Sequence, residues 1–189
     1  MDECRWRDRP LCTRRGLPVP FVAAVDPATG EGDFRHLDPE LTARLVKFRL
    51  CAVCGDPVIA WHVFLGDPAA LDPGGYFMEP PMHEQGALLA LGLIDQATRC
   101  PFMAQAKVPR RPLETGDTLV APMYAGPRRP QVMAYTRHYR PGKMPVIGGA
   151  PGQVQTVFYP GTVARVRTFG FDERGWAVEE VAAGAQDVL

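Results

Sequence analysis

The pattern of apolar positions in the first half of the chain predicts two helices and a buried strand. Leu41, Leu45 and Phe48 recur at helical spacing, and the preceding Asp38-Pro39 supplies an N-cap and a first helical residue, so a helix is expected up to about residue 50. Residues 58–65 form a continuous run rich in Val, Ile, Trp and Phe, typical of a strand buried on both faces. Residues 82–98 are apolar nearly all round, which predicts a buried helix.

The remaining patterns are β-like. Residues 17–25, followed by turn residues at 26–30, predict an N-terminal hairpin. Past Lys107 the predicted strands cover residues 118–124, 131–140, 153–159, 162–171 and 176–181. The Pro- and Gly-rich residues 141–152 predict a mobile loop.

A chain of 189 residues is long enough for one self-sufficient core, so a single domain over residues 1–189 is expected. It divides into a basic arm (1–16), a Cys/His module (17–105) and a β-rich half (106–189). The sequence has no apolar stretch of membrane-spanning length and no apolar core of a signal peptide, which predicts a cytoplasmic protein without membrane contact.

Net charge excludes a global attraction to polyanions, because 21 Lys and Arg balance 21 Asp and Glu. Basic residues nevertheless gather between positions 107 and 143, which predicts a face that meets a protein or nucleic acid partner. The candidate polyanion-binding residues are Arg110, Arg111, Arg128, Arg129, Arg137 and Arg140.

The motif Cys51-Ala-Val-Cys54-Gly55 predicts metal binding. Two thiolates at this spacing chelate one tetrahedral ion, while the glycine permits the tight turn around it, so Zn²⁺ is the expected cofactor. An odd count of five cysteines argues against a disulfide framework. A thioredoxin-like motif would require a helix directly after it, whereas Asp56-Pro57 and a strand follow here; two plain buried cysteines are the other alternative.

His83, in the first turn of the predicted buried helix, is the best-placed third ligand. A knuckle followed by a strand, a loop and a helix that offers ligands is the order of a treble clef, in which the next ligand would stand at Gly86. Glycine has no ligand atom, so the fourth ligand is Cys100, Cys12, Cys4 or a water. Cys100 is one helix length from His83, roughly 25 Å along an unbroken helix. The predicted fold is therefore α+β, a treble-clef-like zinc-knuckle module with a buried helix, followed by an antiparallel sheet.

The first 105 or so residues resemble a family of uncharacterised Cys-rich proteins from actinobacteria and their phages. The resemblance rests on Cys51-Ala-Val-Cys54-Gly55, Pro80-Pro81-Met82-His83 and Cys100-Pro101-Phe102, and on two N-terminal segments, residues 9–12 and 16–21. The family pattern has Cys at the positions of Gly86 and Arg9, where this chain departs from it. The resemblance implies metal binding at Cys51, Cys54 and His83, and it implies no activity.

Three functions are compatible with these features. The first is a zinc-stabilised module that binds a macromolecule. The second is a metal-dependent enzyme with an open Cys₂His site, hydrolytic or deaminase-like toward a small molecule, in which Glu84 would act as general base on bound water. The third is a metal-free scaffold that binds a small molecule.

Overall fold

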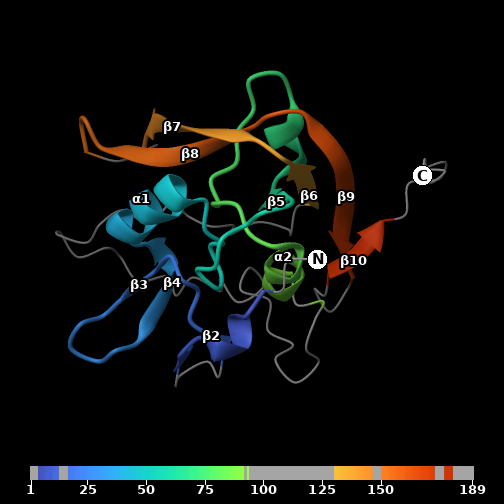
Figure 1. Ribbon diagram of the computed structural model, residues 1–189. Coiled ribbons are helices and arrows are strands. Elements are labelled where there is room, and N and C mark those ends of the chain that lie inside the picture. Colours follow the sequence, from blue (N-terminus) through green and yellow to red (C-terminus); the bar gives the residue numbers. More distant parts are fainter. Residues whose placement is uncertain are drawn as a thin grey trace.

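The computed structural model describes residues 4–12, 17–91, 93, 130–146, 150–172 and 177–180, and these form an α+β fold (Figure 1). Its helices are η1 (Trp6–Asp8), α1 (Pro39–Phe48), η2 (Pro68–Leu71) and α2 (Glu84–Ala90). Its strands are β1 (Leu11–Cys12), β2 (Leu17–Pro18), β3 (Ala23–Val25), β4 (Gly32–Leu37), β5 (His62–Gly66), β6 (Gln131–Thr136), β7 (Tyr139–Pro145), β8 (Val154–Pro160), β9 (Val163–Phe171) and β10 (Ala177–Glu180). No helix among the described residues is both long and apolar enough to cross a membrane.

The main sheet joins the two halves of the sequence. Its strand order is β10-β9-β6-β5, with every neighbouring pair antiparallel. β5 from the first half pairs along its whole length with β6 from the second, from His62 opposite Thr136 to Gly66 opposite Val132. All residues of β6 are buried, so this strand is covered on both faces.

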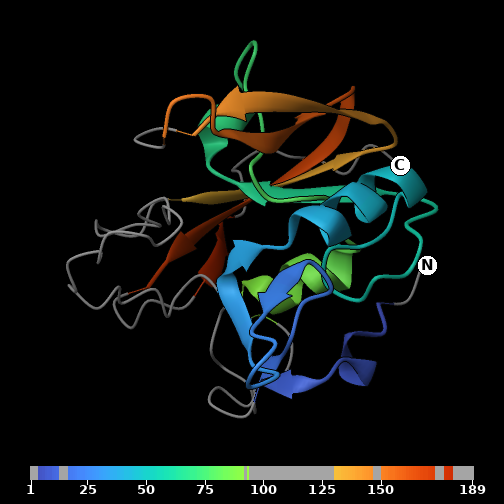
Figure 2. The same cartoon turned by 90° about the vertical axis from the view of Figure 1, so that its left-hand side faces the viewer.

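Two hydrophobic cores lie on opposite faces of this sheet. On one face, Val63 and Leu65 of β5 and Met133 of β6 pack in a cluster with α2 and the cysteines. On the other face, Phe64 packs in a cluster with Phe158 of β8. The two views agree with this layering, since β5 lies between α2 and the β7–β8 hairpin (Figures 1 and 2). Because successive side chains of β5 point to opposite faces of the sheet, this one strand contributes to both cores.

Several local predictions are confirmed. The β3–β4 hairpin forms as expected. α1 begins after Asp38, whose Oδ1 accepts hydrogen bonds from the backbone N–H groups of Glu40 (2.8 Å) and Leu41 (2.9 Å), as an N-cap residue does. The apolar run at 58–65 contains a strand, but it begins only at His62.

Other predictions are corrected. Residues 139–145, partly assigned to a mobile loop, are the strand β7, which pairs with β8 in a hairpin. α2 begins at Glu84, with His83 as its N-cap rather than inside its first turn. The treble-clef arrangement is not confirmed, because β5 pairs with a distant strand instead of forming a hairpin that leads into α2. Residues 94–129, with the strand predicted at 118–124, lie outside the described residues.

Candidate metal centre

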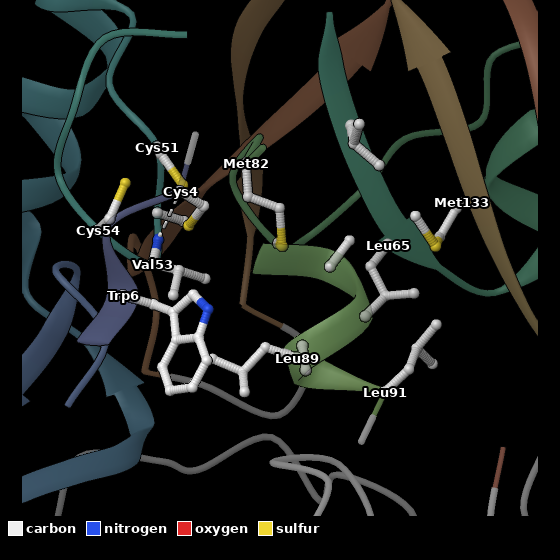
Figure 3. Packing of buried hydrophobic residues seen from close by; sticks show 14 of the residues in the cluster. Cys4, Trp6, Cys51, Val53, Cys54, Leu65, Met82, Leu89, Leu91 and Met133 are labelled. Atoms are coloured by element: carbon white, nitrogen blue, oxygen red, sulfur yellow. Dashed lines mark hydrogen bonds between the residues drawn. The ribbon is translucent and has the colours of Figure 1, made fainter. Parts of the chain in front are cut away.

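Four ligand-bearing side chains meet at the N-terminal end of α2. The Sγ atoms of Cys4, Cys51 and Cys54 and a ring nitrogen of His83 all lie within 4.8 Å of one another, and all four residues are buried. Ligand atoms around a tetrahedral zinc ion are roughly 3.5–3.8 Å apart, so a contraction of about 1 Å would bring the set to that geometry. Figure 3 shows the three sulfurs close together beside Trp6 and Met82.

The knuckle that carries Cys51 and Cys54 is a tight loop after α1. The Cys51 N–H donates to the Asp56 carbonyl (2.7 Å), and the Gly55 N–H donates back to the Cys51 carbonyl (2.9 Å). Gly55 has a φ of 83°, and a Cβ there would lie 2.6 Å from Cδ2 of Phe21, so only glycine fits. The Cys51 sulfur accepts N–H groups from Val53 and His83, each at 3.4 Å. These donors stabilise a thiolate at Cys51.

His83 is held with one ring nitrogen toward the cysteines. The preceding residue, Met82, exchanges backbone hydrogen bonds with Val63 (3.0 and 2.9 Å), which anchors the start of α2 on β5. Nε2 of His83 lies 3.2 Å from the Pro57 carbonyl, and Nδ1 lies 3.5 Å from Sγ of Cys54. Since a carbonyl only accepts, Nε2 carries the proton. Nδ1 is then free of a proton and can act as a ligand.

Cys4 reaches the centre because the N-terminal arm is docked on the module. Trp6 is buried and belongs to the same core cluster, and Arg5 forms a salt bridge with Asp56 of the knuckle. The Cys4 N–H donates to Oε1 of Gln85, 81 residues later in the chain (3.0 Å). The sequence left Cys4 as one of four alternatives for the fourth ligand, with Cys100, Cys12 and a water. The large apolar side chain of Trp6 in the arm was the signal that could have favoured it.

Gly86 lies beside the Cys4 thiol. A Cβ at Gly86 would lie 3.1 Å from Cγ2 of Val53, which is tight, and 3.5 Å from Sγ of Cys4, which is an ordinary contact. A side chain longer than a methyl group at position 86 could therefore extend into the space of the Cys4 thiol. In this chain, Cys4 lies where a ligand from the first turn of α2 would reach.

The pKa values of Cys51 and Cys4 are shifted in opposite directions. Burial alone would raise the pKa of Cys51, but hydrogen bonds from Cys4, from Cys54 and from backbone N–H groups outweigh it and hold that pKa well below its usual value. Hydrogen bonds to Cys51 and Cys54 raise the pKa of Cys4. A cation bound as a thiolate complex would release the protons that remain on the thiols.

The other predicted site residues are distributed as follows. Cys100, Arg110, Arg111, Arg128 and Arg129 lie outside the described residues, as does the side chain of Cys12 at the end of β1. Arg137 and Arg140 are exposed, and each guanidinium lies over an aromatic ring, that of Trp61 (4.8 Å) and of Tyr159 (4.1 Å) respectively.

Glu84 takes part in an ion-pair network. Its Oε1 accepts hydrogen bonds from the Tyr135 hydroxyl (2.7 Å) and from Nη1 of Arg167 (2.8 Å), and Arg167 also pairs with Glu179 (2.7 Å). Burial raises the pKa of Tyr135 to about 12, so the phenol stays a donor. The network ties the first turn of α2 to β6 and β9. It gives Glu84 a positioning contact that the sequence did not reveal.

His62, at the start of β5, is buried. Among the described residues its ring nitrogens have no hydrogen-bond partner of regular geometry, although backbone groups of Thr136 and Arg137 weakly favour its protonated form. Burial and the positive charges of Arg49 and His138 lower the pKa of His62 to about 4. The ring is therefore neutral at pH 7.

This shift predicts a loss of stability in acid. Between the ordinary pKa of 6.5 and about 4, the unfolded chain gains a proton at His62 that the folded chain does not. The free energy of unfolding should fall through this group by up to about 3 kcal/mol as the pH drops over that range. The check is urea unfolding of the wild type and of His62→Gln, each at pH 7 and at pH 4.5. Both proteins lose metal in acid, so that contribution to the pH dependence cancels in the comparison. Equal pH dependence in the two proteins would contradict the assignment.

No protein-family model, curated protein or solved structure matches this chain. What the four side chains bind therefore follows from their own chemistry.

Proposed function

We propose that the chain is a zinc-stabilised binding module in which Cys4, Cys51, Cys54 and His83 hold one zinc ion in a closed structural site. The observation that carries this is the convergence of four buried ligand atoms within 4.8 Å. Three thiols and one imidazole are a common donor set of structural zinc, and thiolates disfavour magnesium and calcium. Cys4, Cys51 and Cys54 are free thiols, so their sulfurs are available.

Without an ion, this buried cluster would contribute little to the stability of the fold. Three thiols and an imidazole are polar groups that occupy core volume, and burying such groups costs free energy unless they are well paired. Within the described part of the chain, the Cys51 and Cys54 sulfurs contact N–H groups and a ring nitrogen at 3.4–3.5 Å, and hydrogen bonds to sulfur are weak. An ion that neutralises the thiolates and binds all four atoms would turn this cost into folding free energy. The proposal includes the reducing cytoplasm as compartment, since free thiols persist there.

A closed site is favoured over a catalytic one. Four protein ligands complete a tetrahedron, whereas catalytic zinc keeps one position for water. The carboxylate proposed as general base, Glu84, already binds Arg167 and Tyr135. Both observations support a structural centre. The macromolecular partner is proposed to bind through the basic segment 107–143, of which Arg137 and Arg140 are exposed cations.

The metal content of the purified protein tests the proposal. We expect one zinc per chain in elemental analysis and native mass spectrometry, because the four ligands form one set. Chelation should release the ion together with protons from the thiols. A chain that contains no transition metal after expression and refolding with excess zinc would overturn the proposal. Gly30, far from the centre in a turn with open space around it, offers the control variant Gly30→Asn, which should keep full zinc content.

A further inference from the structure

A cavity of about 340 Å³ lies beside the knuckle. Its walls are Arg49, which caps the C-terminal end of α1, the segment 58–60 before β5, and the turn between β6 and β7. The volume lies within the usual range for small-molecule pockets. The titratable and charged residues that line it are Arg49, His62, Arg137 and His138.

The lining is positively charged without a counter-charge. No acidic residue is among the described residues that line the cavity. Neither Arg49 nor Arg137 has a carboxylate partner within the described part of the chain, and Arg137 is held over the ring of Trp61. The turn that carries His138 is fixed, because its carbonyl accepts from the Thr136 hydroxyl (2.8 Å) and from the Gly161 N–H (2.7 Å). Cations held together in this way favour an anion between them.

Two buried polar groups, one in the cavity wall and one behind it, lack partners among the described residues. His62, which lines the cavity, is 2% exposed, and within the described part of the chain neither of its ring nitrogens has a hydrogen-bond partner of regular geometry. The Tyr139 hydroxyl is also buried and has no partner among the described residues, and the Tyr139 ring lies 4.9 Å from that of His62. Unpaired buried polar groups are rare because each costs free energy. A neutral histidine and a phenol each have one proton to donate, so a ligand with acceptor oxygens can pair with them.

The cavity also has an apolar rim. Ile59 is 80% exposed and lines the cavity, and Trp61, 37% exposed, lies under the guanidinium of Arg137. An isolated exposed apolar residue needs no explanation, but here one lines a cationic cavity and another contacts one of its arginines. A ligand with an anionic end and an apolar body fits this combination better than a bare ion.

We propose that this cavity binds a small phosphorylated molecule, with the phosphate between Arg49 and Arg137 and the organic part against Ile59. A phosphate monoester is favoured over a carboxylate because its three terminal oxygens and double charge match two guanidinium groups plus imidazole donors. This site goes beyond the proposed function because it adds a small-molecule ligand. The metal affects it only through the knuckle that carries Cys51 and Cys54.

The knuckle closes the cavity wall. The Val58 N–H donates to the Arg49 carbonyl (2.9 Å), and Leu50 forms a β-bridge with Pro57. Cys51 and Cys54 lie between these two paired ends. An ion on the cysteines therefore fixes the distance between the two walls, and its removal should weaken ligand binding.

The test titrates metal-loaded full-length protein with inorganic phosphate, AMP and acetate by calorimetry and by NMR shifts of the residue 58–62 amides. We expect AMP to bind more tightly than phosphate and acetate to bind weakest. Arg49→Gln and Arg137→Gln should each weaken AMP binding at least ~10-fold, whereas Arg44→Gln, at an exposed cation on α1 outside the cavity lining, should not. Circular dichroism and zinc content show whether each variant is folded.

Three results would overturn the proposal. The first is no saturable binding of phosphate or AMP by folded protein at ~10 mM, above the usual ligand range. The second is an equal loss of AMP affinity in Arg44→Gln. The third is tight binding of a single-stranded oligonucleotide in place of AMP, which would make this a nucleic-acid surface. Zinc content of the same samples separates failure here from failure of the metal centre, since zinc-loaded protein that binds no phosphate leaves the centre intact.

Discussion

Replacing Cys51 with Ser is expected to abolish stoichiometric metal binding and to unfold most of the protein. Cys51 is fully buried, and its sulfur is the one that receives backbone N–H groups from two segments. Structural zinc supplies roughly 10–16 kcal/mol in zinc-finger peptides, while whole domains are stable by only about 5–15 kcal/mol. Loss of the ion therefore removes a contribution as large as the net stability. Thermal unfolding by circular dichroism, with and without a chelator, measures it.

The matched control is Met82→Leu, which lies next to His83 in the same core. Met and Leu have similar volumes, so this change should cost less than about 1.5 kcal/mol and leave zinc content unchanged. A Cys51→Ser protein that unfolds at the wild-type temperature would exclude a metal contribution to folding. The same holds for wild-type protein whose unfolding is insensitive to chelation.

Moving a cysteine from position 4 to position 86 is expected to restore a metal site that Cys4→Ser has weakened. The energy of the four-ligand site, divided among its ligands, gives roughly 3 kcal/mol each, so Cys4→Ser should lower zinc affinity about 100-fold. A Cβ at Gly86 would lie 3.5 Å from the Cys4 sulfur, so a thiol there can reach the same vertex. Zinc competition with a chromophoric chelator measures both affinities.

The single variant Gly86→Cys tests whether a cysteine at position 86 can be added beside Cys4 or can only replace it as a ligand. With Cys4 still present, the new side chain meets the Cys4 sulfur and Val53, so it should destabilise the fold or expel the arm rather than tighten binding. The double variant Cys4→Ser, Gly86→Cys should then bind zinc more tightly than Cys4→Ser. If the double variant stays as weak as Cys4→Ser, Cys4 does not occupy the fourth vertex.

The sequence predicted those structural features that depend on local interactions. The cap at Asp38 and the knuckle with Gly55 each depend on contacts within a few residues, and both are present as expected. Likewise, the apolar run before residue 66 predicted a two-sided strand because alternate residues of β5 enter different cores.

The features that the sequence did not predict depend on long-range packing. Cys4 reaches the centre through Trp6 and Gln85, and no periodicity in a short arm foretells such a contact. β7 was misassigned because Pro141 and Gly142 are turn residues by composition, yet a hairpin at the edge of a fold tolerates both. The pairing of β5 with β6 joins strands that lie far apart in sequence, which composition does not encode.

The docked arm has a consequence for the order in which the centre assembles. Cys51 and Cys54 are held by one loop and can capture an ion early, while His83, 29 residues beyond Cys54, requires β5 to form first. Cys4 arrives only when the arm packs, tied by Trp6 and by the exposed Arg5–Asp56 pair. Because Cys4 is expected to arrive last, we expect it to be the first ligand to leave. Zinc exchange with the cell would then proceed through release of the arm, and its rate would follow the stability of that contact rather than of the core.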